Sequence, residues 1–407
     1  MLNVLTKTKP WIVASLLVAT SIFGDTGEIA QDSCRPKSCE QPKPVCPPPK
    51  PVCPPKPCPP PPVCPPKPCC EQRPPIQMCP AYNMPARVDV RGCWDVYAGA
   101  SFIYWQARQE NMEFASSQVA ATVGTVQTNT IVNYDFSYKP GFKVLLGMNF
   151  DHDGWDGYAE YTWFKNSTSN SVGLVAATPT TTTALFTIKQ IPAINGGNNY
   201  TSISEAWDLK LQFLDTALAR TYYVGTNLTF RSIFGARFAW LTQYKTQTAT
   251  NDGTTGAGTA GTYFMRQNYA SWGAGAMAGL NTNWIFGEDF RMIGNGSFDL
   301  LYTRVATSNT KFIVSDLADV TTATYGFPES RPDFLMPHTN IEIGFGWGTY
   351  FDCYNWHIDL SATYCFQTFW NANLNREWVD DVDAYNSLSP NGNLYVHGLT
   401  ASLKLDF

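Results

Sequence analysis

The sequence predicts an all-β protein: a transmembrane antiparallel up-and-down β-barrel of about ten strands (ten to twelve), preceded by a disordered, polyproline-type arm that is rich in cysteine. Three observations support this fold class: long segments in which apolar and polar residues alternate, a strand that ends the chain, and connections of alternating length. A period of two gives each strand one apolar and one polar face. We therefore expect one face to contact lipid and the other to enclose a lumen.

The first residues have the pattern of a secretory signal peptide. Lys7 and Lys9 precede the uncharged run 11–23, and Gly24 follows it. This run is shorter than the roughly 20 residues that a membrane-spanning helix needs. We therefore expect residues 1–24 to be a signal peptide. No later segment reaches the length of a membrane-spanning helix, which excludes a helical membrane protein.

Residues 25–92 form the predicted arm. Of the 29 prolines in the chain, 21 lie between Pro36 and Pro85. A polyproline II rod rises about 3.1 Å per residue, so neighbouring cysteines lie farther apart than the Cα separation of about 7 Å that a disulfide tolerates. In an oxidising compartment such thiols favour cross-links to other chains, namely to cysteine-rich envelope proteins. A metal site at the adjacent pair Cys69 and Cys70, or a stiff spacer with incidental disulfides, remains an alternative. The cysteines of the arm are Cys34, Cys39, Cys46, Cys53, Cys58, Cys64, Cys69, Cys70 and Cys79.

Residues 93–407 form the predicted barrel. Short links at 151–154, 287–289 and 352–355 alternate with long ones at 108–135, 168–205, 246–267, 304–337 and 371–393. A change of phase near Phe213 and Leu214 predicts a β-bulge. The ten expected strands cover 94–107, 138–150, 155–163, 206–224, 228–245, 272–286, 290–302, 340–351, 356–370 and 394–407.

Aromatic residues end the apolar faces of many of these strands. Strands of this length, tilted by about 45°, match an apolar band with aromatic girdles at both of its edges. A soluble sandwich is the alternative, but these strands would give it an oversized apolar face. One girdle is expected at Trp94, Phe150, Trp155, Trp284, Phe290, Phe351, Trp356 and Phe407, and the other at Trp163, Trp240, Trp272, Tyr302 and Trp370.

The last strand carries a predicted insertion signal. Leu403, Leu405 and Phe407 are apolar and two residues apart, with Lys404 and Asp406 between them. A strand that ends on an aromatic carboxyl terminus resembles the C-terminal targeting strand of outer-membrane barrels. The resemblance implies insertion into outer-membrane lipid by the barrel-assembly machinery.

Several stretches of the barrel resemble a known family. They are D-V-Y-A-G-A-S-F-I-Y-W at Asp95, L-D-T-A-L-A-R-T-Y-Y-V at Leu214, F-G-A-R-F-A-W at Phe234 and F-D-L-L-Y at Phe298. In this order they resemble the Legionella-type major outer membrane proteins, which are pore-forming barrels that also occur in environmental chlamydiae. The cysteine-rich arm is more similar to the disulfide-linked envelope proteins of chlamydiae. The two resemblances imply a pore and a structural role in the bacterial outer membrane.

The alternation assigns charged residues of both signs to the lumen, among them Asp208. Such residues either select ions in a pore or form structural salt bridges across it. Barrels of eight strands are filled by side chains, so a passage through ten strands should be narrow. Lys139, Asp156, Lys245, His357 and Lys404 are further inward positions. The candidate pore-lining residues are Lys143, Glu160, Lys210, Arg231, Arg237, Arg291, Asp299, Glu342 and Asp359.

These features predict a porin-like protein for passive diffusion of small solutes, with a disulfide-linked structural role. A structural or adhesive surface antigen with a plugged barrel is the alternative. An outer-membrane enzyme is disfavoured, because the four histidines have no legible catalytic partners. We therefore expect no catalytic residue, metal or cofactor. The net charge of −5 leaves no basic footprint for nucleic acid, and homo-oligomers are compatible with the pattern.

The strand count also predicts where cysteines lie. An even number of strands puts residue 93 and Phe407 at the same, periplasmic end, so the arm is expected in the periplasm. Cys93 and Cys353 should share that rim and reach thiols of the arm. Cys365 should point into the lumen and stay free.

Overall fold

The computed structural model describes residues 84–90, 95–121, 127–150, 153–179, 181–188, 200–253, 260–287, 289–316, 322–378, 387–388 and 392–407. The predicted signal peptide, the cysteines 34–79 and Cys93 lie outside these residues. No helix within the described ranges is long and apolar enough to cross a membrane.

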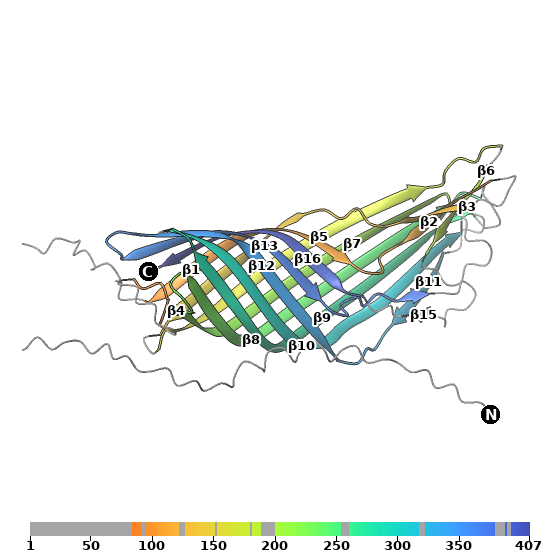
Figure 1. Cartoon of the computed structure of the whole chain (residues 1–407). Coiled ribbons are helices and arrows are strands. Elements are labelled where there is room, and N and C mark those ends of the chain that lie inside the picture. The colour runs from red at the N-terminus through yellow and green to blue at the C-terminus, as the bar shows by residue number, and fades with distance from the viewer. Residues whose placement is uncertain are drawn as a thin grey trace, which may run out of the picture. The chain divides into compact units, whose positions relative to one another are not determined.

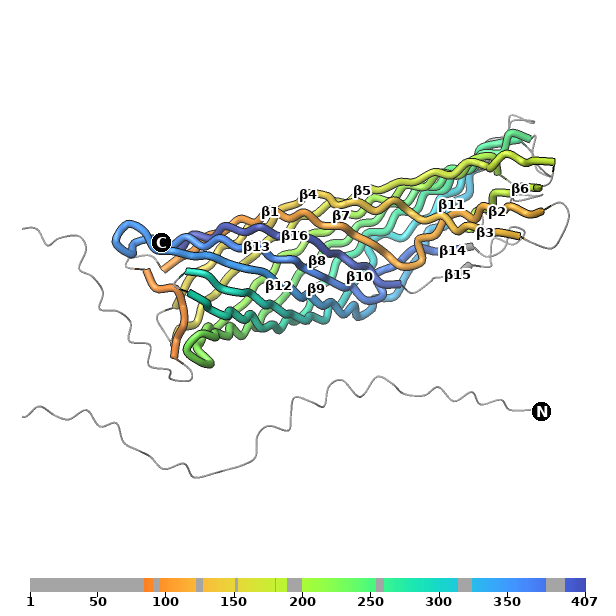
Figure 2. The backbone as a smooth tube through the Cα atoms, turned by 45° about the horizontal axis from the view of Figure 1, so that its top comes forward, coloured from red at the N-terminus to blue at the C-terminus, as the bar shows by residue number. Residues whose placement is uncertain are grey.

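Ten antiparallel strands form a closed barrel, as predicted (Figures 1 and 2). The barrel closes because the last strand pairs with the first over thirteen register positions, from Tyr97–Asp406 to Gln109–Leu394. The order around the barrel is β1 (Val96–Gln109), β4 (Lys139–Asn149), β5 (Trp155–Gly173), β7 (Ser202–Tyr223), β8 (Leu228–Asn251), β9 (Gly261–Ile285), β10 (Phe290–Asp316), β12 (Phe334–Phe351), β13 (Trp356–Phe369) and β16 (Leu394–Asp406).

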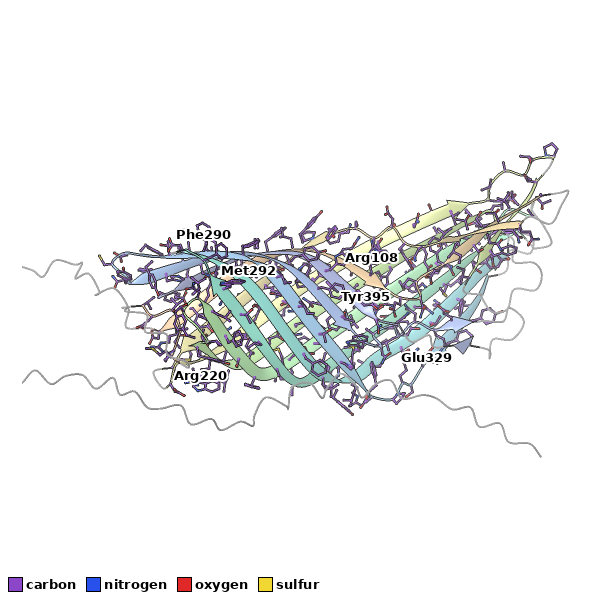
Figure 3. The ribbon with its side chains drawn as sticks, viewed as in Figure 1. Arg108, Arg220, Phe290, Met292, Glu329 and Tyr395 are labelled. Carbon is purple, nitrogen blue, oxygen red and sulfur yellow. The ribbon has the colours of Figure 1, made fainter. Side chains whose placement is uncertain are left out.

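The two ends of the barrel differ. One end carries the short connections and the C-terminus, and we call it the turn end; the other carries the long connections, and we call it the loop end (Figure 1). In Figure 3, Arg220 lies at the turn end and Glu329 at the loop end.

Strands β7, β8, β9 and β10 are longer than predicted. They have 22, 24, 25 and 27 residues, about twice the 9–11 residues that cross a bilayer as a strand. The expected loops 246–267 and 304–337 are therefore wrong in large part: they continue the strands, and β11 (Thr322–Pro328) adds to the side of β10. A register shift between Val305 and Thr307 marks a β-bulge in β10.

The expected loops 108–135 and 168–205 also contain strands. β2 (Ala115–Ala121) pairs with β3 (Gln127–Val132) and β6 (Thr181–Thr187) in a separate three-stranded sheet at the loop end (Figure 2). In the link 371–393, β14 (Glu377–Trp378) and β15 (Ser387–Leu388) form a two-residue pairing.

The predicted bulge in β7 is wrong. Its pairing with both β5 and β8 is continuous through Phe213 and Leu214. What changes there is the chemistry of each face: Trp207, Leu209, Leu211 and Phe213 point inward and are buried. The apolar residues move from the outer face to the inner face, and the alternation of the strand continues unbroken.

The outer face of the barrel wall is apolar. Phe290, Trp284, Trp356, Trp272 and Tyr302, all members of the predicted girdles, have exposed side chains, and their depth in a membrane stays a prediction. Phe290 and Met292 project from the outer surface in Figure 3. At the turn end Trp356 contacts Phe407, with ring centroids 5.4 Å apart. Trp94 lies outside the described residues.

Two inward glycines permit close contact between strands. A Cβ atom on Gly275 would lie 1.9 Å from the carbonyl oxygen of Leu300, and one on Gly344 would lie 2.1 Å from that of Ala362. Only glycine fits at such distances, and tight curvature of a small barrel brings inner faces this close.

Candidate functional site in the barrel lumen

The centre of the lumen contains a buried network around Arg237. Its guanidinium donates two hydrogen bonds to Asp215, at 2.6 and 2.7 Å, and one to Asp299 at 2.8 Å. His338 Nδ1 lies 2.7 Å from the same Asp299 oxygen, and both of these side chains are fully buried. The register explains the first contact, because Asp215 and Arg237 are directly opposite on β7 and β8.

A second group of ionic contacts surrounds Lys143. Its ammonium lies 3.3 Å from Glu160 and 3.7 Å from Glu342, which come from β5 and β12. Glu342 also accepts hydrogen bonds from Asn295 and Asn340. One cation thus holds two carboxylates from opposite parts of the wall.

Toward the turn end the inner wall carries three further ion pairs. Arg231 pairs with Asp156, and Arg291 with Asp359. Lys404 lies 2.7 Å from Asp406, which His357 also contacts. Together with the two groups above, these residues form what we call the charged section of the lumen. Its cations are Lys143, Arg231, Arg237, Arg291 and Lys404, and its anions are Asp156, Glu160, Asp215, Asp299, Glu342, Asp359 and Asp406.

Two cavities lie in the charged section. One, of about 240 Å³, is lined by Lys143, Glu160 and Arg237 among others. The other, of about 420 Å³, is nearer the turn end and is lined by Arg291 and Asp359 among others. The two share several lining residues, including Arg231. Since a water molecule takes about 30 Å³ of liquid volume, each cavity has room for several waters among polar partners.

A buried apolar cluster, which we call the plug, lies in the lumen on the loop-end side of the charged section. Phe213 stacks on Phe369 with ring centroids 5.5 Å apart, and Trp105 contacts Phe164 at 5.7 Å. The plug borders the buried network directly, because the His338 ring centroid lies 4.1 Å from that of Phe369. Its buried members are Ile103, Trp105, Ala107, Met112, Tyr134, Phe164, Trp207, Leu209, Leu211, Phe213, Ala239, Leu241, Leu301, Met336, Cys365, Phe369, Ala372, Leu394 and Val396.

Part of the link after β13 folds into the barrel and completes the plug. Residues 372–375 are buried, and inward glutamines bind the backbone of this segment. Gln243 donates to the carbonyl of Ala372 at 3.1 Å, and Gln267 to that of Arg376 at 2.7 Å. Buried carbonyls need such partners, so the glutamines hold the segment inside the lumen.

A short segment before the first strand packs on the turn end. Pro85 pairs with Tyr222, and Ala86 N–H donates to the carbonyl of Thr221 at 3.1 Å. Arg87 donates to the carbonyl of Phe150 at 2.8 Å and lines the larger cavity. Residues 84–87, which were expected to belong to the arm, therefore contact the barrel.

The structure places most of the predicted lumen residues on the inner wall. Lys143, Glu160, Arg231, Arg237, Arg291, Asp299, Glu342 and Asp359 all belong to the charged section. Whether they line a conducting pore stays a prediction.

Lys210 and Asp208 are exceptions, since both lie on the outer face of β7. The false bulge inverted their orientation in the sequence-based prediction. The same error hid Asp215, which lies inward opposite Arg237. It also hid the plug aromatics Trp207 and Phe213. The unbroken alternation through residue 213 is the signal that could have found them.

The two described cysteines differ. Cys365 is free and buried in the lumen wall, as predicted. Cys353, in the turn-end link between β12 and β13, is disulfide-bonded.

No group of three or more His, Cys, Asp or Glu side chains among the described residues is arranged to hold a metal ion. The leucines and phenylalanine of the predicted insertion signal lie at the β16 end of the wall, with Leu403 exposed on the outer face.

A closed antiparallel barrel with an apolar outer face and a polar, ion-paired interior defines the class of outer-membrane β-barrel proteins. Residues 89–407 match the sequence pattern of one protein family, described as the Legionella pneumophila major outer membrane protein precursor. The chain belongs to this family, which confirms the predicted resemblance and places the protein in the bacterial outer membrane.

Solved structures give weaker likenesses. The outer membrane protease OmpT from Escherichia coli is 11% identical, with 79% of this chain and 99% of that chain covered and a TM-score of 0.35. The Pseudomonas putida toluene transporter TodX is 8% identical, with 77% and 89% covered and a TM-score of 0.26. A Pseudomonas aeruginosa FadL homologue is 8% identical, with 77% and 90% covered and a TM-score of 0.22. At such TM-scores the likenesses say nothing about what this chain does. No curated protein matches.

Proposed function

We propose that the protein is a narrow, gated pore of the outer membrane that passes small cations and small polar solutes. The turn end faces the periplasm and the apolar plug acts as the gate. The protein has no catalytic role in this proposal.

The observation that carries the proposal is the charged section with its two adjoining cavities, of about 240 and 420 Å³. Side chains of both signs around water-sized spaces can replace the hydration shell of a passing ion. Eight of the ten strands contribute five cations and seven carboxylates to this section, so that with neutral histidines it has an excess of two negative charges. Such an excess favours cations over anions.

A second function is favoured by the plug. A barrel whose lumen is closed by a buried apolar core also fits a structural or adhesive surface protein that transports nothing. The two functions differ in one respect, which is whether the plug opens in a membrane.

Planar-bilayer recordings of the full chain separate the two. We expect small conductance steps, because the passage is narrow, and a reversal potential in a KCl gradient that shows preference for K⁺. Replacing Glu160 and Asp359 by Gln and Asn should reduce this preference, because it removes two negative charges from the lumen.

Asp208→Asn is the matched control. It changes the net charge of the chain by one unit on the outer face, so selectivity should stay unchanged. A protein that inserts with its native heat-modifiable gel mobility and never conducts would contradict the pore and support the closed structural barrel.

The proposal includes a disulfide-linked structural role for the arm. It is supported by nine cysteines within residues 34–79, since thiols at this density favour cross-links in an oxidising compartment. Deletion of residues 34–79 should release the barrel from high-mass, reductant-sensitive complexes on non-reducing gels and leave its heat-modifiable mobility intact. Complexes that persist after the deletion would contradict this role.

A further inference from the structure

The outer face of the barrel carries two lysines directly opposite each other. Lys165 of β5 and Lys210 of β7 are register partners, and both side chains are exposed. Opposite positions on one face bring Cβ atoms to about 4.5–5.5 Å, where like charges destabilise the sheet. A pair of this kind is stabilised when an anion binds between the two ammonium groups.

Two carboxylates, Asp208 and Asp135, lie in the neighbourhood of the lysines without pairing with them. Asp208 lies on the same outer face, directly opposite Ser167, and Ser167 is two residues beyond Lys165 on β5. Asp135 lies near β5, where its carbonyl accepts a hydrogen bond from Thr168. Among the described residues, neither carboxylate forms an ion pair with Lys165 or Lys210, and the exposed ammonium groups are available to a ligand.

The two lysines follow immediately on the apolar band. Trp163 precedes Lys165 by two residues on the same face, and it stacks on Phe142 with ring centroids 5.6 Å apart. On β7, Leu214 belongs to the apolar band, and Gln212, opposite Trp163, lies between it and Lys210. Since girdle aromatics lie at the level of lipid headgroups, the ammonium groups reach that level at the loop end.

The same face carries a second such pair farther around the barrel. Arg266 of β9 is directly opposite Lys311 of β10, and both are exposed. Arg304, two residues beyond the girdle residue Tyr302, is exposed as well. The strip of wall beyond the loop-end girdle is therefore basic on several strands.

We propose that Lys165 and Lys210 bind the phosphate of a lipid headgroup in the leaflet at the loop end. A phosphate monoester offers oxygens to both ammonium groups, and charge-assisted hydrogen bonds of this kind are the strong ones. The acyl chains of the same lipid pack on the adjacent outer face at Trp163 and Leu214. The site does not depend on whether the lumen conducts.

The test uses the full chain in dodecyl maltoside micelles doped with phosphatidic acid or with phosphatidylcholine. Native mass spectrometry counts bound lipid, and tryptophan fluorescence follows thermal unfolding. We expect Lys165→Gln/Lys210→Gln to bind phosphatidic acid about tenfold more weakly, since two charge-assisted contacts are lost. Lys139→Gln, a lysine of the inner wall, should bind like the unaltered protein.

The effect of the variants on thermal stability should have opposite signs in the two lipids, and this distinguishes a ligand site from a structural role. In phosphatidylcholine, each single Gln variant should be at least as stable as the unaltered protein, because repulsion is removed. In phosphatidic acid the unaltered protein should be the more stable. Equal binding of phosphatidic acid by the double variant would overturn the proposal. The same stabilisation by inorganic phosphate at equal concentration would also overturn it, because the ligand would then not be a lipid.

Discussion

The charged section and the apolar plug occupy the interior of the same barrel with opposite chemistry. In the charged section, every cation named above contacts a carboxylate from another strand or from its own. In the apolar plug, a few strand positions farther along the same strands, rings and aliphatic chains fill the space. The strands of the wall run on from one section to the other, so the difference lies in their inward side chains and in the segment 372–375 that folds into the plug.

The difference teaches how the interior is stabilised. Buried ions are costly unless paired, and removal of one partner leaves the other uncompensated. Buried apolar groups instead contribute through packing, so their loss leaves a cavity. The charged section should thus be sensitive to charge, and the plug to volume.

The largest effect is expected from emptying the plug. Phe213→Ala/Phe369→Ala removes the two stacked rings beside the charged section. Single-channel conductance should rise by about tenfold, because a dewetted constriction then admits water. Stability should fall, by about 3–5 kcal/mol per ring on the scale of soluble cores.

Phe298→Ala/Phe345→Ala is the control for this variant. Both rings are exposed on the outer face, so the same atoms are deleted without opening the lumen. Unchanged conductance in the plug variant, with a normally folded barrel, would show that the constriction lies elsewhere.

The next effect is expected from Arg237→Met in the charged section. It leaves Asp215 and Asp299 buried without their counterion, which costs about 3–5 kcal/mol in comparable pairs. The urea midpoint in detergent, followed by tryptophan fluorescence, measures it. Further replacement of both aspartates by Asn should restore most of the loss, and a midpoint that stays low would refute the charge argument.

Arg220→Met gives the matching exposed case at the turn end. Arg220 pairs with Asp153 at 2.9 Å, and the Asp153 side chain is half exposed. Exposed pairs contribute about 0–1 kcal/mol, so this variant should lie close to the unaltered protein.

A smaller effect is expected for Lys245 and Glu205, which lie beyond the plug toward the loop end. Their side chains are fully buried and 2.7 Å apart. Replacing both by Met and Leu should leave stability between unchanged and about 1–2 kcal/mol higher, since apolar pairs avoid the desolvation of two ions. The same urea titration tests it, and a clear loss would mean that the pair stabilises the barrel.

The sequence predicted the strands correctly in the part of the barrel where one face of each strand contacts lipid. Trp272, Trp284 and Phe290 alternate with polar residues, and such faces are visible without knowledge of the neighbours. Beyond the girdle that rule fails, because both faces of β7 to β10 meet either water or a filled lumen. There Tyr263 and Met265 point inward and Arg266 outward, so the apolar face is the inner one.

The candidate site was predictable only in part, for the same reason. Arg237 and Glu160 were placed inward because lipid-facing neighbours fixed the phase. Lys210 was assigned to the wrong face because, in a sequence, an exchange of apolar and polar residues between the two faces of a strand resembles a β-bulge that shifts the alternation by one residue. The inward fold of residues 372–376 depends on distant partners such as Gln243 and Gln267, which no local pattern reveals.

The smallest effect concerns the loop-end rim, where Arg108 and Tyr395 are register partners on β1 and β16 (Figure 3). Just beyond β1, a hydrogen bond from the Tyr395 hydroxyl and one from the Asn393 amide hold the pKa of Glu110 below its ordinary value of 4.5. A lowered folded pKa means that the contribution of Glu110 is complete above the unfolded pKa and is lost as pH falls through the folded pKa.

Protection of the Asn393 amide from hydrogen exchange should therefore be high at neutral pH and decline once Glu110 is protonated. The change should be small, because Glu110 is largely exposed and solvent screens the interaction. In Glu110→Gln the protection factor should be independent of pH over the same range, since a neutral amide accepts the bond at any pH. Equal protection of Asn393 at pH values above and below the Glu110 titration in the unaltered protein would show that the rim is held by its backbone contacts, such as Glu110 N–H to the Asn393 carbonyl at 3.0 Å, and not by the carboxylate.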